Sequence, residues 1–204
     1  MLRFRPGSVL TLLALAAPSF PALATELEIE AIGGFQQTGS LSSREGTIDL
    51  DAGPLYGLAA GWRVKPDGLV EIAWTRHEAE ASGDLVSGPV GYDVVVDTLE
   101  FGGLWETRPG KMRPFLGLSL GGTRLASDGE DFADGWNASG SISGGVRYLL
   151  GERALLRLEA RASGIYFADG GALGCTFPAG VCGVNASGSI LGAFSARVAL
   201  AARF

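Results

Sequence analysis

The amino-acid sequence predicts an all-β fold: a transmembrane, antiparallel, up-and-down β-barrel of eight strands with short periplasmic turns and long extracellular loops. Three observations lead to this prediction. First, 47% of the residues are hydrophobic, yet beyond the N-terminal segment no apolar run approaches the roughly 20 residues of a transmembrane helix. Second, apolar and polar residues alternate with a period of two in eight successive segments. Third, short and long connections alternate between these segments. Because lipid cannot satisfy exposed backbone groups, strands that cross a membrane must close into a barrel.

The first four segments each place apolar residues on one face. In the first, aliphatic residues alternate with glutamates. In the second, apolar residues from Tyr56 to Val64 share a face, and the same parity continues back through Leu50, so we expect this strand to project beyond the membrane. The polar face of the third ends at His77, and the fourth carries Asp97 as an exception on its apolar face.

The last four segments repeat the pattern with arginine on the polar face. The fifth opposes leucines to Arg113 and small residues, and the sixth opposes its aliphatic residues to serines and Arg147. The seventh sets leucines against Arg157 and Arg161, and the apolar face of the eighth ends at Phe204. The eight expected strands cover residues 26–36, 56–64, 70–77, 95–106, 113–123, 137–148, 156–166 and 187–204.

The connections differ in length and composition. Lys65–Gly68, Arg108–Lys111 and Leu150–Arg153 are expected to be tight turns because of their Pro, Gly and Asp content. Longer polar loops are expected near residues 38–46, 81–91, 126–135 and 169–185. An even number of strands places both ends of the barrel domain in the periplasm.

The N-terminal segment has the composition of a secretory signal peptide. Arg3 and Arg5 precede the apolar stretch 9–17, and Ala22-Leu23-Ala24 matches a small-x-small cleavage site. We therefore expect a signal peptide at residues 1–24 and one barrel domain at 25–204. Cleavage of the signal peptide would remove Arg3 and Arg5 and make the net charge of −6 more negative. A negative net charge argues against nucleic acid as a partner.

A soluble barrel or sandwich with its apolar face inward also alternates. The polar faces here consist of Ser, Gly, Thr, Arg and Glu, whereas both lysines, Lys65 and Lys111, lie in turns. Soluble surfaces intersperse charges more freely, and small residues with a few long ones suit the crowded lumen of a small barrel. These features favour the membrane barrel over the soluble alternative.

Aromatic residues of the apolar faces fall near the strand ends, as in the interfacial girdles of membrane barrels. On the turn side the expected aromatics are Trp62, Trp105, Tyr148 and Phe204. On the loop side they are Phe35, Trp136 and Tyr166.

The last strand, with Val198, Leu200, Ala202 and Phe204 on one face, resembles the terminal signal read by the outer-membrane assembly machinery. With the signal peptide, eight strands, short turns and long loops, the mature chain resembles the small outer-membrane barrels of the OmpA/OmpX type. The resemblance implies residence in the cell outer membrane, among its lipids and lipopolysaccharide, and assembly by that machinery. We expect a monomer without a cofactor, and no cell-wall-binding domain after Phe204.

Charged residues on the polar faces form the main candidate site, a network inside the lumen. In a closed barrel the last strand pairs with the first, which should bring Arg197 toward Glu28 and Glu30. Because an unpaired buried charge is costly and eight strands leave just enough room for side chains, we expect a plug of ion pairs. A gate or narrow ion path is the alternative. The expected members are Glu28, Glu30, Glu71, Glu100, Glu159, Arg63, Arg113, Arg147, Arg157, Arg161 and Arg197.

His77, the only histidine, is the candidate residue for an enzyme. A catalytic base needs a nucleophile and an orienting acid, but Glu78-Ala79-Glu80 follows it without a His-x-Ser pattern, and it should point inward, away from lipid. We expect no catalysis. The acidic loops could bind Ca²⁺ or Mg²⁺, but their spacing does not match an EF-hand; we expect a solvated surface and no metal site.

Cys175 and Cys182 are the only cysteines. An even count in an exported chain favours a disulfide in the last long loop. Two free thiols or a metal pair are the alternatives, the latter a poor zinc site without a nearby histidine.

Three functional classes remain. The first is a non-enzymatic outer-membrane protein with a structural or surface-interaction role. The second is a narrow porin-like channel for ions or small solutes, and the third is a lipid A-modifying enzyme.

Overall fold

The computed structural model describes residues 26–43, 46–85, 88–107, 110–127, 130–131, 136–167, 175–176, 181–182 and 189–204. The predicted signal peptide at 1–24 lies outside these residues. Among the described residues, no helix is long and apolar enough to cross a membrane.

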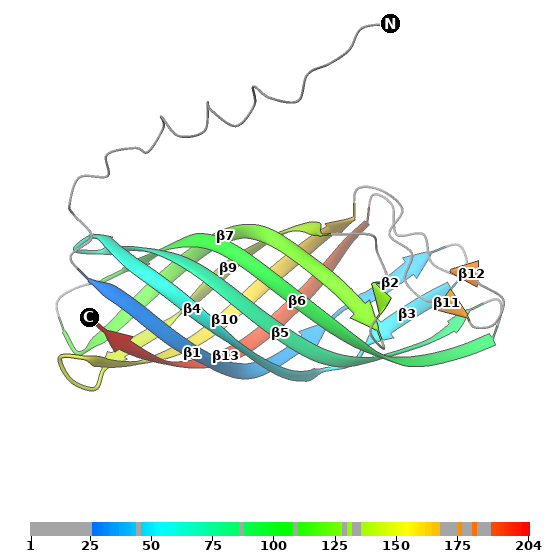
Figure 1. Ribbon diagram of the computed structural model, residues 1–204, viewed down its shortest axis with the longest axis horizontal. Helices are drawn as coiled ribbons and strands as arrows, with labels where there is room; N and C mark the ends of the chain where they lie inside the picture. The colour runs from blue at the N-terminus through cyan, green and yellow to red at the C-terminus, as the bar shows by residue number, and fades with distance from the viewer. Residues whose placement is uncertain are drawn as a thin grey trace, which may run out of the picture.

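Eight long strands in this part of the chain form one closed barrel (Figure 1). Each pairs antiparallel with the next long strand, and β13 pairs with β1 from Glu28 opposite Arg203 to Thr38 opposite Ala193. This confirms the predicted eight-stranded, up-and-down antiparallel barrel. The long strands are β1 (Leu27–Thr38), β4 (Gly53–Lys65), β5 (Gly68–Leu85), β6 (Gly88–Glu106), β7 (Met112–Ser127), β9 (Asn137–Leu149), β10 (Ala154–Phe167) and β13 (Ser189–Arg203).

The two ends of the barrel differ. At the left of Figure 1, the turn end, the start of β1 lies near the C-terminus, and short turns join β4 to β5 and β9 to β10. At the right, the loop end, lie the short strands. These are β2 (Ser40–Ser43), β3 (Gly46–Leu50), β8 (Glu130–Asp131), β11 (Cys175–Thr176) and β12 (Val181–Cys182).

Two of the expected loops consist largely of strand instead. The segment near 81–91 continues the β5–β6 hairpin, which pairs from Gly68 opposite Trp105 to Leu85 opposite Gly88. The segment near 38–46 enters the β2–β3 hairpin. Their polar composition predicted loops, but strand pairing is made by backbone hydrogen bonds, which polar side chains do not prevent. The predicted loops near 126–135 and 169–185 lie largely outside the described residues.

The expected face of Leu50 is wrong. Leu50 pairs with Ala81 and Leu55 with His77, so the segment 50–55 holds one residue more than the segment facing it. An extra residue of this kind, a bulge, reverses which face the following side chains occupy. Leu50 is therefore buried inside, although its parity in the sequence matches the outward-facing Tyr56.

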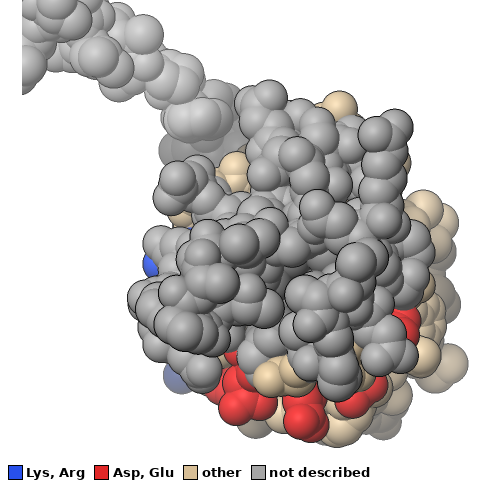
Figure 2. All heavy atoms as spheres, turned by 90° about the vertical axis from the view of Figure 1, so that its right-hand side faces the viewer, with Lys and Arg blue, Asp and Glu red and all other residues tan. Residues whose placement is uncertain are grey.

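The barrel wall has an apolar outer face over the part nearest the turn end. Inside this part lie charged side chains and smaller apolar clusters, one of them formed by Leu69, Leu104 and Phe115. Toward the loop end the interior is apolar and the outer face carries acidic residues. A buried apolar cluster fills the interior there, while Glu78, Glu80 and Asp93 are exposed on the outside. Figure 2 looks onto the loop end and shows acidic side chains gathered along its lower edge. The buried cluster comprises Leu50, Ala81, Val94, Val96, Leu125, Ile165, Phe167 and Leu191.

Candidate functional site

The charged side chains of the barrel interior form the candidate site. The period of two of each strand turns alternate residues inward, and all of the expected lumen residues have the inward parity. Arg113 is partly buried near the turn end. The other ten are buried: Glu28, Glu30, Glu71, Glu100, Glu159, Arg63, Arg147, Arg157, Arg161 and Arg197.

Three of these charged groups and Glu106 form a ring across the lumen near the turn end. Arg63 Nη2 lies 3.0 Å from Glu28 Oε1, and Arg63 Nη1 lies 2.9 Å from Glu106 Oε1. Arg147 Nη1 lies 2.6 Å from Glu106 Oε2, and Arg147 also pairs with Glu28. The four come from β4, β1, β9 and β6. Of these strands only β1 and β4 pair in the barrel wall, so three of the four ion pairs join strands that are not neighbours.

The ring continues to the rim at the turn end. Glu26, just before β1, accepts hydrogen bonds from Arg63 Nε at 2.8 Å and pairs with Arg203 Nη2 at 2.6 Å. Burial raises the pKa of the Glu26 carboxyl, but its hydrogen bonds with Arg203 and Arg63 outweigh burial and hold the pKa below its ordinary value. The rim therefore favours the ionised carboxylate.

A second group lies deeper in the lumen around Arg157. Its Nη1 is 2.9 Å from Glu30 Oε2 and 2.5 Å from Glu71 Oε2, and its Nε is 3.1 Å from Glu159 Oε2. Arg147 Nη2 lies 3.6 Å from Glu30 Oε1, which connects this group to the ring. One guanidinium thus faces three carboxylates from β1, β5 and β10.

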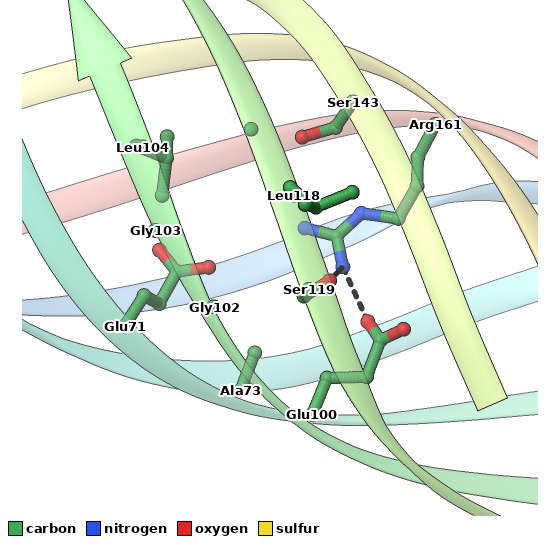
Figure 3. A pocket seen from close by; sticks show the side chains of 11 residues that line it. Glu71, Ala73, Glu100, Gly102, Gly103, Leu104, Leu118, Ser119, Ser143 and Arg161 are labelled. Carbon is green, nitrogen blue, oxygen red and sulfur yellow. Dashed lines mark hydrogen bonds and ion pairs between the residues drawn. The ribbon is translucent and has the colours of Figure 1, made fainter. Parts of the chain in front are cut away.

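Arg161 extends the network toward the β6–β7 wall. Its Nε donates to Glu159 Oε1 at 2.7 Å, and its Nη1 pairs with Glu100 Oε2 at 2.5 Å. Figure 3 shows Glu100 and Arg161 pointing toward each other beside Ser119, with Glu71 facing the same small cavity. Glycines line the cavity wall, so space remains where larger side chains would fill it.

The expected position of Arg197 is wrong. In the β1–β13 register Arg203 lies opposite Glu28, whereas Arg197 lies opposite Gly34. Its Nε donates to Ser195 Oγ at 2.9 Å. A strand's parity fixes its inward face, but the stagger between the two strands decides which residues meet.

The predicted set of lumen charges lacks two residues that form ion pairs with it, Glu106 and Arg203. Glu106 is buried and pairs with both arginines of the ring; Arg203 Nε lies 3.4 Å from Glu28 Oε1. Each shares its strand parity with a predicted member, Glu100 or Arg197, so parity alone could have found them. Their positions at the strand ends make them resemble turn residues.

His77 is buried inside, as its parity predicts. Its Nδ1 lies 3.1 Å from the Pro54 carbonyl oxygen, a bond to backbone rather than to a nucleophile or acid. Within the described ranges, no group of three or more His, Cys, Asp and Glu side chains is placed to hold a metal ion.

The expected girdle aromatics are all exposed on the barrel exterior: Phe35, Trp62, Trp105, Trp136, Tyr148, Tyr166 and Phe204. Asp97, the exception on the apolar face, pairs there with Arg76, Nη2 to Oδ2 at 2.7 Å. In the last loop, the β11–β12 backbone places Cys175 directly opposite Cys182.

Comparison with solved structures places this geometry among known barrels. Neisserial surface protein A has a TM-score of 0.62 and 15% identity, covering 87% of this chain and 97% of its own. The outer membrane protein OprG from Pseudomonas aeruginosa has a TM-score of 0.58 and 14% identity, covering 87% and 95%. No family model matches the chain, and no curated protein matches its sequence. The closed ring of eight antiparallel strands and these two likenesses together show that the chain has the fold of the small eight-stranded outer-membrane barrels.

Proposed function

We propose that the chain is an integral outer-membrane protein with a structural or surface-interaction role, and that its Arg/Glu network closes the lumen. The observation that carries the proposal is the ring of Arg63, Glu28, Arg147 and Glu106, which crosses the barrel from four strands. A path through the lumen would have to break this ring.

The outer face supports residence in a membrane. A contiguous exposed apolar belt of this extent is foreign to soluble monomers, whose patches rarely exceed a few hundred Å². Lipid would cover it, and the exposed aromatics near its edges match the residue types that favour membrane interfaces. The belt includes Leu58, Phe101, Leu116, Leu118, Leu120, Ile142, Leu158, Phe194 and Leu200.

The network supports a plug over a channel. An eight-stranded barrel has room for interior side chains but little more, and here long side chains of opposite charge occupy that room. Arg147 and Arg157 are buried and each meets more than one carboxylate. Removing any one partner would leave another charge uncompensated, which favours a fixed structure.

The loop end of the barrel supports a role at the cell surface rather than catalysis. The strands extend beyond the apolar belt at the loop end, and the solved structure of similar fold described as a surface protein supports this assignment. His77 does not support an enzyme, because its hydrogen bond goes to the Pro54 carbonyl.

Planar-bilayer recording tests the proposal. The mature chain, folded in detergent and inserted into a lipid bilayer, should give no steady conductance. The variant Glu152→Gln, at an exposed turn position outside the network, should behave identically, whereas Arg147→Gln should give intermittent openings. A large, stable, ohmic pore in the unmodified protein would refute the plug and favour the channel.

A further inference from the structure

Three charged side chains form a row on the outer face of three adjacent strands. Asp97 on β6 lies directly opposite Arg76 on β5 and, on its other side, directly opposite Arg124 on β7. Arg76 donates from Nε and Nη2 to the two Asp97 oxygens at 2.8 and 2.7 Å, and its side chain is 38% exposed. The row thus holds two guanidiniums and one carboxylate.

The row lies where the apolar belt ends. On the turn side, the next outward-facing residues of β5 and β6 are Trp74 and Leu99. The stretch of β6 from Trp105 to Asp97 has about the length, 9–11 residues, that a tilted strand needs to cross the hydrocarbon core. On the loop side, Glu78 is the next outward-facing residue of β5 and is exposed. The row therefore marks the boundary between an apolar and an acidic surface.

Aromatic rings flank the row on the same face. The Arg76 guanidinium lies 5.7 Å from the centre of the Trp74 ring, which packs edge-on against Tyr56 with 6.5 Å between ring centres. The Tyr56 hydroxyl donates to Glu78 at 2.9 Å. A Cβ on Gly122, the outward-facing residue before Arg124, would lie 3.0 Å from the Trp136 ring. Indole and phenol rings favour the headgroup level of a membrane.

We propose that the row of Arg76, Asp97 and Arg124 binds the phosphate of an outer-leaflet glycolipid, the lipopolysaccharide of the outer membrane. Guanidinium groups match the geometry of phosphate oxygens and bind them strongly at a low-dielectric boundary. Asp97 fixes the orientation of Arg76, and the acyl chains of the lipid lie over the apolar belt beneath. The exposed Glu78 keeps the anionic headgroup at the row by repelling it from positions farther out. This site rests on the proposed residence in the outer membrane.

Native mass spectrometry of the mature protein in detergent micelles tests the site. The probe is lipid A carrying both phosphates, compared with the same lipid without phosphates and with inorganic phosphate. The double variant R76Q/R124Q should bind phosphorylated lipid A about tenfold or more weakly, because each lost charge-assisted hydrogen bond is worth at least that factor. R76K/R124K keeps the charges and should recover part of the affinity.

The variant R153Q is the matched control. It removes one arginine at an exposed turn position at the opposite end of the barrel, outside the row, so lipid binding should persist. Equal loss of binding in R153Q and R76Q/R124Q would show that the loss does not come from the row, and equal binding of both lipids would also overturn the site. Binding of inorganic phosphate with no preference for the lipid would assign the row to free anions. Insertion of every variant into liposomes is measured in parallel: failure of the unmodified protein to insert contradicts outer-membrane residence, whereas insertion without lipid preference contradicts only the site.

Discussion

Arg147 on β9 and Glu28 on β1 form an ion pair across the lumen, although 119 residues separate them in the chain. Both side chains are 0% exposed. The pair joins parts of the wall that no backbone hydrogen bond connects directly, since β1 pairs with β4 and β13 while β9 pairs with β7 and β10. The interior network therefore links opposite parts of the barrel wall as well as filling the lumen.

Replacing Arg147 with Gln should strongly destabilise the barrel. Breaking a buried pair by removing one partner costs about 3–5 kcal/mol, because the remaining charge stays buried without compensation. Urea unfolding in detergent or liposomes measures the change. The double variant E28Q/R147Q should recover part of the loss, since the two residues are coupled. Additive effects of the two single changes would mean that the pair does not contribute as a unit.

Replacing Leu118 with Arg tests the lipid-facing belt. Leu118 is 55% exposed on the outer face of β7, and a charge near the bilayer midplane of a barrel costs about 2–4 kcal/mol. Ser82→Arg is the control, because Ser82 is exposed on the part of β5 nearer the loop end, where the change should stay within about 0.5 kcal/mol. Equal effects at the two positions in bilayer-refolding measurements would argue against a lipid-facing belt.

Two neighbouring glycines of β1 should respond differently to alanine. A Cβ on Gly34 would lie 2.3 Å from the Ala196 carbonyl oxygen, whereas a Cβ on Gly33 would meet nothing within 4 Å. Gly34→Ala should therefore cost about 1–3 kcal/mol through overpacking at the β1–β13 closure, and Gly33→Ala should be tolerated. Comparing the unfolding midpoints of the two variants tests this difference. If Gly34→Ala does not lower the midpoint, β1 and β13 can move apart enough to accommodate the methyl group.

Cys175 and Cys182 should form a disulfide that pins the last loop without supporting the barrel. The facing positions of the two residues in β11 and β12 bring their backbones to the separation of a cross-strand pair. Replacing both with Ser should leave heat-resistant electrophoretic migration unchanged and increase protease cleavage of the loop. Thiol labelling of both cysteines on intact cells without reductant would show that they are free.

The sequence alone determined the class of fold and the character of each face. Alternation with a period of two identifies the strands and places Glu28, Glu71, Arg147 and Arg157 on one side of the wall. Each of these side chains lies inside, because parity is a local property that survives whatever the strand pairs with.

Only the tertiary structure decided which residues meet. A shift of two residues between strands keeps every face and changes every partner, so the sequence could not show that Glu28 faces Arg203 instead of Arg197. One extra residue between Leu50 and Leu55 turned Leu50 inward. The row of Arg76, Asp97 and Arg124 likewise exists only because the registers of three strands align. Stagger and closure are properties of the whole barrel, and no local pattern encodes them.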